Sequence, residues 1–79
     1  MDINKVVVAI NKYQEKTGGQ QGFDEDMAQY DELVDDGENE ICFDSKAFSN
    51  QTTRWTFSVE TARGKIISVH GKEEEDYRE

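Results

Sequence analysis

The chain has 79 residues, of which 34% are hydrophobic and 34% are charged. That length supports a single domain with one modest core, because small domains bury a smaller fraction of their surface than large ones do. The single cysteine, Cys42, excludes an intramolecular disulfide, so we expect a reducing cytoplasm rather than secretion. The formal net charge of −9 disfavours direct contact with nucleic acid, because phosphates are bound by cations.

The first predicted element is an amphipathic helix over residues 2–16. Apolar side chains fall on one side of it at about 100° per residue, namely Ile3, Val6, Val7, Ile10 and Tyr13. Three consecutive valines favour a buried strand as the alternative, but the absence of proline and glycine favours the longer helix. The apolar run is too short for a secretion signal or a membrane span, so no membrane contact is expected.

A second helix is predicted from Phe23 to about Asp36, after a glycine-rich loop. Its apolar face consists of Phe23, Met27, Tyr30 and Val34, with Leu33 at the flank. Asp24 is placed to cap the first turn, and Glu25 suits the positive end of the helix dipole.

The remaining residues alternate between apolar and polar, which predicts three antiparallel strands. A three-residue loop at 62–64, with Gly64 left-handed, would place Val59 opposite Ile67 and Phe57 opposite Val69. A similar loop at 49–51 would place Phe43 opposite Phe57 and Ile41 opposite Val59.

The predicted fold is therefore α+β, with two N-terminal helices packed on one face of a three-stranded antiparallel meander (ααβββ). This single domain would span residues 1–71. Residues 72–79 contain four consecutive acids, and we expect them to form a flexible acidic tail.

The charge is distributed unevenly along the chain. Residues 17–45 sum to −10, and no lysine or arginine lies between Lys16 and Lys46. On the predicted second helix, like charges four residues apart would destabilise the helix by roughly 0.2–0.5 kcal/mol per pair. We interpret this uncompensated repulsion as a negative field kept for binding. The predicted partner-binding residues are Asp24, Glu25, Asp31, Glu32, Asp35, Asp36, Glu38 and Glu40.

This charge pattern predicts a small acidic protein-binding domain whose partner has a basic surface. Small acidic inhibitors of nucleic-acid enzymes share this size and charge, so an inhibitor or DNA mimic is the favoured interpretation. One alternative is an immunity-type or adaptor module with an aromatic anchor such as Tyr30 or Phe48. Another is a structural homodimer or larger homo-oligomer that pairs at a sheet edge, with an acidic face that only keeps it soluble.

Enzymatic and metal-dependent functions find little support in the sequence. One histidine, His70, and one cysteine, Cys42, lie far apart and give no zinc-binding spacing. The acidic stretch does not fit a calcium-binding EF-hand loop around Gly37. We therefore predict neither catalysis nor a metal or other cofactor.

Overall fold

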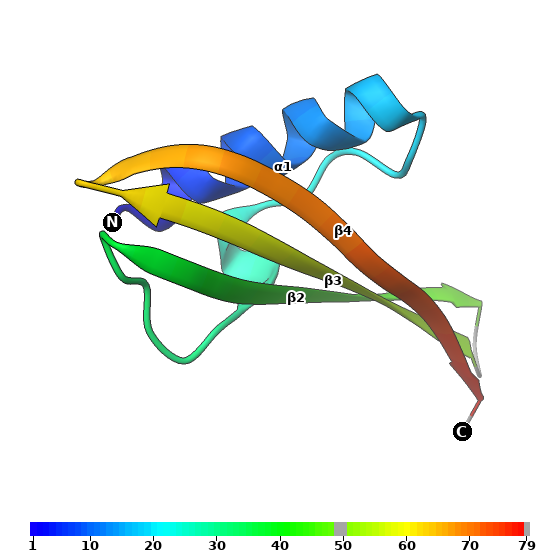
Figure 1. The fold of residues 1–79 in the computed structure, drawn as a ribbon. Helices are drawn as coiled ribbons and strands as arrows, with labels where there is room; N and C mark the ends of the chain where they lie inside the picture. The colour runs from blue at the N-terminus through cyan, green and yellow to red at the C-terminus, as the bar shows by residue number, and fades with distance from the viewer. Residues whose placement is uncertain (49–50, 79) are drawn as a thin grey trace.

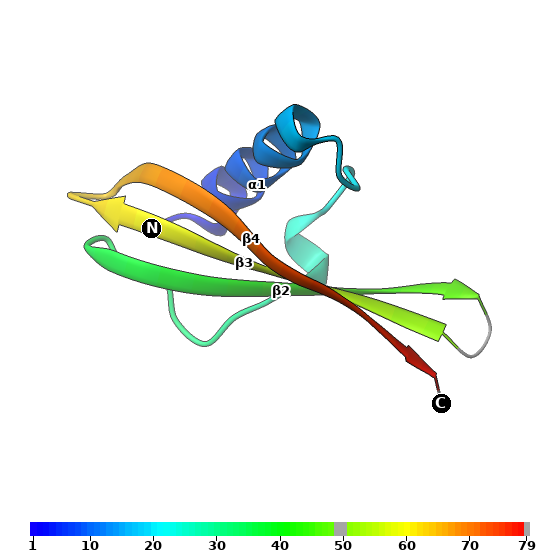
Figure 2. The same ribbon diagram turned by 45° about the vertical axis from the view of Figure 1, so that its right-hand side comes forward.

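The computed structural model describes the backbone of residues 1–48 and 51–78 and the side chains of residues 1–44 and 53–71. It contains one α-helix, one turn of 3-10 helix and four strands in the order α1 (Ile3–Thr17), η1 (Glu25–Met27), β1 (Ala28–Gln29), β2 (Gly37–Phe48), β3 (Gln51–Ala62) and β4 (Lys65–Arg78). The strands form one antiparallel sheet in sequential order. Figures 1 and 2 show α1 lying across one face of this sheet.

The first helix is confirmed, with bounds shifted by one residue. Its first turn is capped by Asp2, whose carboxylate accepts a hydrogen bond from the backbone N–H of Asn4 at 2.9 Å. It ends at Gly18, which has a left-handed φ of 77°. No helix in the described part of the chain is long and apolar enough to cross a membrane.

The prediction of a second helix is wrong, and so is the predicted ααβββ arrangement. Residues 23–36 instead form η1, β1 and an irregular loop that leads into β2. Phe23 and Tyr30 do not share a face, because Phe23 is buried and Tyr30 is 41% exposed. A helix here would have stacked like charges without one compensating lysine or arginine, whereas the irregular path lets the acids separate.

Both hairpins have a different register from the predicted one. The β3–β4 turn has two residues, Arg63 and Gly64, with φ of 54° and 74°, as in a type I′ turn. A register shift lies next to this turn, between Glu60 and Thr61 of β3. As a result, Val59 lies opposite Val69 rather than Ile67, and Phe57 lies opposite Gly71 rather than Val69.

The first hairpin is displaced by two residues. Ile41 lies opposite Phe57 and Phe43 opposite Trp55, rather than Val59 and Phe57. Part of the loop predicted at 49–51 lies outside the described residues. Because side chains alternate with period two, this displacement leaves the apolar residues of β2 and β3 on the predicted face.

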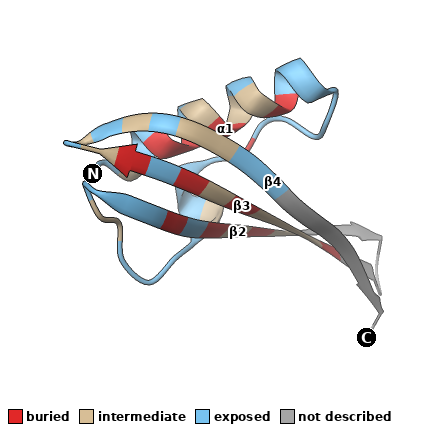
Figure 3. Ribbon diagram, in the orientation of Figure 1, coloured by how far each residue is buried: buried red, intermediate tan, exposed pale blue. Residues whose placement is uncertain are grey.

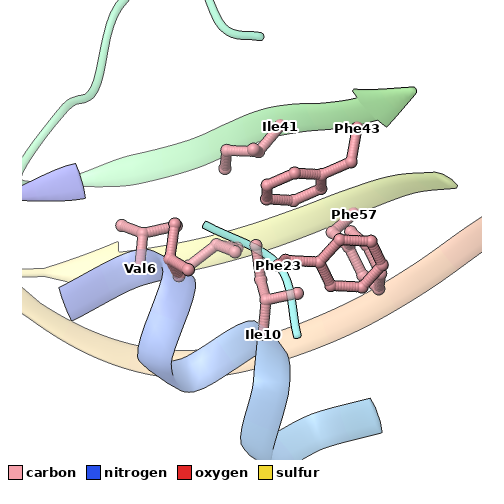
Figure 4. Close-up of a cluster of buried hydrophobic side chains, with 8 residues drawn as sticks. Val6, Ile10, Phe23, Ile41, Phe43 and Phe57 are labelled. Atoms are coloured by element: carbon pink, nitrogen blue, oxygen red, sulfur yellow. The ribbon is translucent and has the colours of Figure 1, made fainter. Parts of the chain in front are cut away.

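The core lies between α1 and the sheet (Figure 3). Its buried members are Val6, Val7, Ile10, Phe23, Ile41, Phe43, Phe57 and Val59. Figure 4 shows Val6 and Ile10 of the helix pointing toward Phe23 and the strand residues. Phe23 stacks on Phe43 with ring centroids 4.5 Å apart, and burial of such a ring contributes roughly 1.5–3 kcal/mol.

The side chain of Asn11 on α1 fixes the position of Phe23. Its Oδ1 accepts hydrogen bonds from the backbone N–H groups of Gly22 and Phe23, both at 3.1 Å. Its Nδ2 donates to the carbonyl oxygen of Phe23 at 3.0 Å. The chain therefore delivers an aromatic side chain to the core without the predicted second helix.

Candidate functional site

The face of the sheet opposite α1 is polar. On β2, Asn39, Ile41 and Phe43 are buried, so the alternate residues point the other way. The residues of this uncovered face are Glu38, Glu40, Cys42 and Asp44 on β2, Arg54, Thr56, Ser58 and Glu60 on β3, and Ser68 and His70 on β4. The uncovered face is thus rich in carboxylates along β2.

An open groove of about 590 Å³ lies beside β2, where the chain leaves β1. The residues that line it are Ala28, Gln29, Tyr30, Asp31, Glu32, Glu38, Asn39, Glu40, Cys42 and Arg54. We call this feature the acidic groove. One wall comes from the segment 28–32 and the other from β2 and β3, so residues distant in sequence meet there.

The segment 28–32 forms what we call the outer wall of the groove, and the loop that contains it is fixed at both ends. At its start, Ala28 and Gln29 pair with Phe43 and Cys42 of β2. At its end, the backbone N–H of Val34 donates to Asn39 Oδ1 at 2.7 Å. The outer wall is therefore held between two points of the sheet.

Buried hydrogen bonds hold the Val34 end of the loop against β3. Asn39, which is 2% exposed, donates from Nδ2 to the carbonyl of Val59 at 3.2 Å. The hydroxyl of Thr61 donates to the carbonyl of Val34 at 2.8 Å. Asn39 was not among the predicted site residues, because its role depends on a register that the sequence pattern did not reveal.

Four of the eight predicted binding residues come together in the acidic groove, namely Asp31, Glu32, Glu38 and Glu40. The hydroxyl of Ser58 donates to Glu38 Oε1 at 2.7 Å, which holds that carboxylate against the sheet. Asp31 and Glu32 are exposed on the loop. The groove thus combines carboxylates from a loop and from a strand.

The other four predicted residues lie elsewhere. Asp24 and Glu25 are exposed at η1 and do not line the groove. Asp35 Oδ1 contacts the N-terminal ammonium group at 2.7 Å. Asp36 Oδ1 accepts a hydrogen bond from the backbone N–H of Arg63 at 2.7 Å, so this aspartate is used in anchoring the β3–β4 turn.

Among the described residues lining the acidic groove, Arg54 alone is cationic. Its Nε and Nη2 donate to Asp44 Oδ1 and Oδ2 at 2.8 and 3.1 Å, and Gln29 Nε2 donates to Asp44 Oδ2 at 2.9 Å. The hydrogen bond from Arg54 lowers the pKa of Asp44, although desolvation opposes this shift. Neither Asp44 nor Arg54 is among the predicted binding residues, and their contact could not be predicted because it depends on the β2–β3 register.

Among the residues that the structure describes, no three histidine, cysteine or carboxylate side chains are grouped to hold a metal ion. No protein-family model matches the chain, and neither curated proteins nor solved structures give a match. The function is therefore inferred from the groove and its charge.

Proposed function

We propose that this domain binds a basic surface of another protein through the acidic groove and the adjoining uncovered face. The supporting observation is that Asp31, Glu32, Glu38 and Glu40 line one open groove. The cation among its described lining residues, Arg54, is already bonded to Asp44. A cationic partner would therefore meet an excess of carboxylates.

The favoured partner is a nucleic-acid-processing protein, because such proteins carry basic surfaces that bind phosphates. The predicted second helix can no longer supply a row of charges, since that helix does not exist. The supporting geometry lies instead on β2. Alternate residues on one face of a strand lie about 6.6–6.8 Å apart, which is close to the phosphate spacing of about 6–7 Å along a nucleic-acid strand. Glu38 and Glu40 are two such alternate residues on that face.

The homodimer alternative draws less support from the sheet edge. β4 is the longer of the two terminal strands of the sheet, the other being the two-residue β1, and the pairing of β4 with β3 contains two register shifts. Bulges of this kind discourage pairing between sheet edges. The acidic groove therefore supports binding to a different protein better than β4 supports pairing with a second copy.

The experimental test compares two pairs of consecutive acidic residues, each an aspartate followed by a glutamate. The groove variant Asp31→Asn/Glu32→Gln and the control Asp24→Asn/Glu25→Gln each remove two exposed charges. The immobilised proteins are used to capture partners from cell lysate at about 50 mM salt, where charge attraction is screened little. Each captured protein is then purified and its affinity measured by calorimetry.

We expect the groove variant to bind the purified partner about tenfold more weakly, whereas the control variant binds nearly as the wild type does. Nucleic acid should compete with the domain for that partner, as the inhibitor interpretation requires. Equal losses in the two variants, or affinity unchanged at about 500 mM salt, would contradict the proposal.

A further inference from the structure

Tyr30 is an exposed aromatic side chain in the acidic groove. Among the described residues, the exposed large hydrophobic side chains are Val8, Tyr30 and Ile67. Of these three, Tyr30 lines the groove. It directly precedes Asp31 and Glu32, so the loop presents an aromatic ring and two carboxylates in consecutive residues.

The loop carrying Tyr30 is already ordered by the sheet. Gln29, the preceding residue, pairs with Cys42 in β1–β2 and donates a hydrogen bond to Asp44. At the other end, Val34 is bonded to the buried Asn39. A loop whose backbone is held at both ends loses little backbone conformational entropy on binding, which favours Tyr30 as an interface anchor.

A guanidinium group of the protein itself, that of Arg54, lines the groove and is bound by Asp44, a carboxylate of the adjoining uncovered face. Arg54 contacts both oxygens of Asp44 through Nε and Nη2, the forked arrangement that a lysine ammonium cannot form. Arginine also stacks on aromatic rings more readily than lysine does. Tyr30 with Asp31 and Glu32 offers these two kinds of contact together.

We infer that the basic partner enters the acidic groove with an arginine side chain, which stacks on Tyr30 and bonds the neighbouring carboxylates. This inference rests on the proposed function and narrows it to one side-chain chemistry. The domain would therefore distinguish arginine from lysine at equal charge. An interaction that depended on net charge alone would not make that distinction.

The test uses two synthetic peptides of equal length and charge, one alternating arginine with serine and the other alternating lysine with serine. Their affinities for the wild-type domain are measured by calorimetry at low salt. We expect the arginine peptide to bind about two- to fivefold more tightly, which is the scale of an exposed cation–π contact. Tyr30→Ala should weaken this preference, leaving only the part that the carboxylates contribute, and Tyr30→Phe should retain it in full.

The control variant is Ile67→Ala, which truncates an exposed hydrophobic residue that does not line the groove. It should keep the arginine preference. Circular dichroism checks that each variant is folded, and Tyr30→Phe gives a second folded comparison if Tyr30→Ala is destabilised.

Equal affinities for the two peptides, or an arginine preference as large in Tyr30→Ala as in the wild type, would overturn the inference. If Asp31→Asn/Glu32→Gln still weakened both peptides, the basic-surface proposal would stand without the arginine contact. If that variant changed neither affinity, the proposed function itself would fail.

Discussion

At the residue scale, Asp44 shows how one carboxylate among many acquires a defined role. It accepts hydrogen bonds from both Arg54 and Gln29, so it links β2, β3 and β1 across the uncovered face. Asp24 has no comparable contact and makes no capping hydrogen bond at η1. The number of acids in the chain therefore says little about what each one does.

The lowered pKa of Asp44 predicts a pH-dependent contribution to folding. An aspartate whose pKa is lower in the folded state stabilises the fold fully above its unfolded value of about 3.9. That stabilisation is lost as the pH falls through the folded-state pKa. Asp44→Asn should therefore cost stability at pH 7, and the difference from the wild type should narrow as the pH is lowered below about 4.

The expected loss at pH 7 is about 0.2–1 kcal/mol, because the Arg54 and Asp44 side chains are 43% and 27% exposed and water screens the pair. Urea unfolding at several pH values measures it. Asp24→Asn is the matched control, since it removes one aspartate charge without removing an arginine contact. A loss for Asp44→Asn that is independent of pH would contradict the assignment.

At the scale of secondary-structure elements, the sequence identified the helix and the long strands but not the segment between them. Periodicity succeeded for α1, β2 and β3 because burial there follows one simple repeat. Between Phe23 and Val34 the spacing also suits a helix, but only Phe23 is buried. Its place in the core is set by Asn11 on another element, which a local repeat cannot reveal.

From the sequence alone, we interpret the like-charge repulsion in this segment as a strain kept for function. The structure supports a simpler physical reading, in which repulsion without a lysine or arginine favours the irregular loop over a helix. The candidate site was therefore only half predictable. Because of the loop path, Asp31 and Glu32 line the same groove as Glu38 and Glu40. A helix would instead have placed Asp35 and Asp36 beside Asp31 and Glu32.

In the β3–β4 turn, we predict that two substitutions change the folding stability in opposite directions. Arg63 has a left-handed φ of 54°, which is costly for a residue with a side chain, while Gly64 suits its φ of 74°. Arg63→Asn should stabilise the protein by up to about 1 kcal/mol, because Asn-Gly is preferred in type I′ turns. Gly64→Ala should destabilise it by about 1–2 kcal/mol.

The cost of Gly64→Ala would arise from the backbone, because an added Cβ would meet only Asp35 Oδ1, at 3.9 Å. Urea unfolding at about 0.5 M NaCl limits the effect of the lost Arg63 charge. Lys65→Gln removes the same charge beside the turn and serves as the control. If Arg63→Asn proved no more stable than Lys65→Gln, the turn would not limit stability.

At the scale of the whole molecule, α1 has a small excess of positive charge, with three exposed lysines against the exposed Glu15, whereas β2 is acidic. The lysines of α1, Lys5, Lys12 and Lys16, are exposed on the element that covers the core. The carboxylates of β2 face away from that helix. A partner approaching in solution would therefore be oriented by the field before any contact forms.

The same excess of acid should make folding stability rise with salt. With 18 acidic and 9 basic residues, repulsion outweighs exposed ion pairs such as Asp44–Arg54, so screening should favour the compact state. We expect the melting temperature to rise by about 5 °C between about 20 and 500 mM NaCl, equivalent to roughly 1 kcal/mol for a domain of this size.

Asp31→Asn/Glu32→Gln should show a smaller rise, because part of the repulsion around the groove is already gone. Partner binding should weaken over the same salt range in which folding becomes more stable. These opposite responses separate the two roles of the charge, since salt that merely unfolded the domain would lower stability and binding together. A melting temperature that falls with salt would show that attractive pairs, rather than repulsion, dominate the field of this molecule.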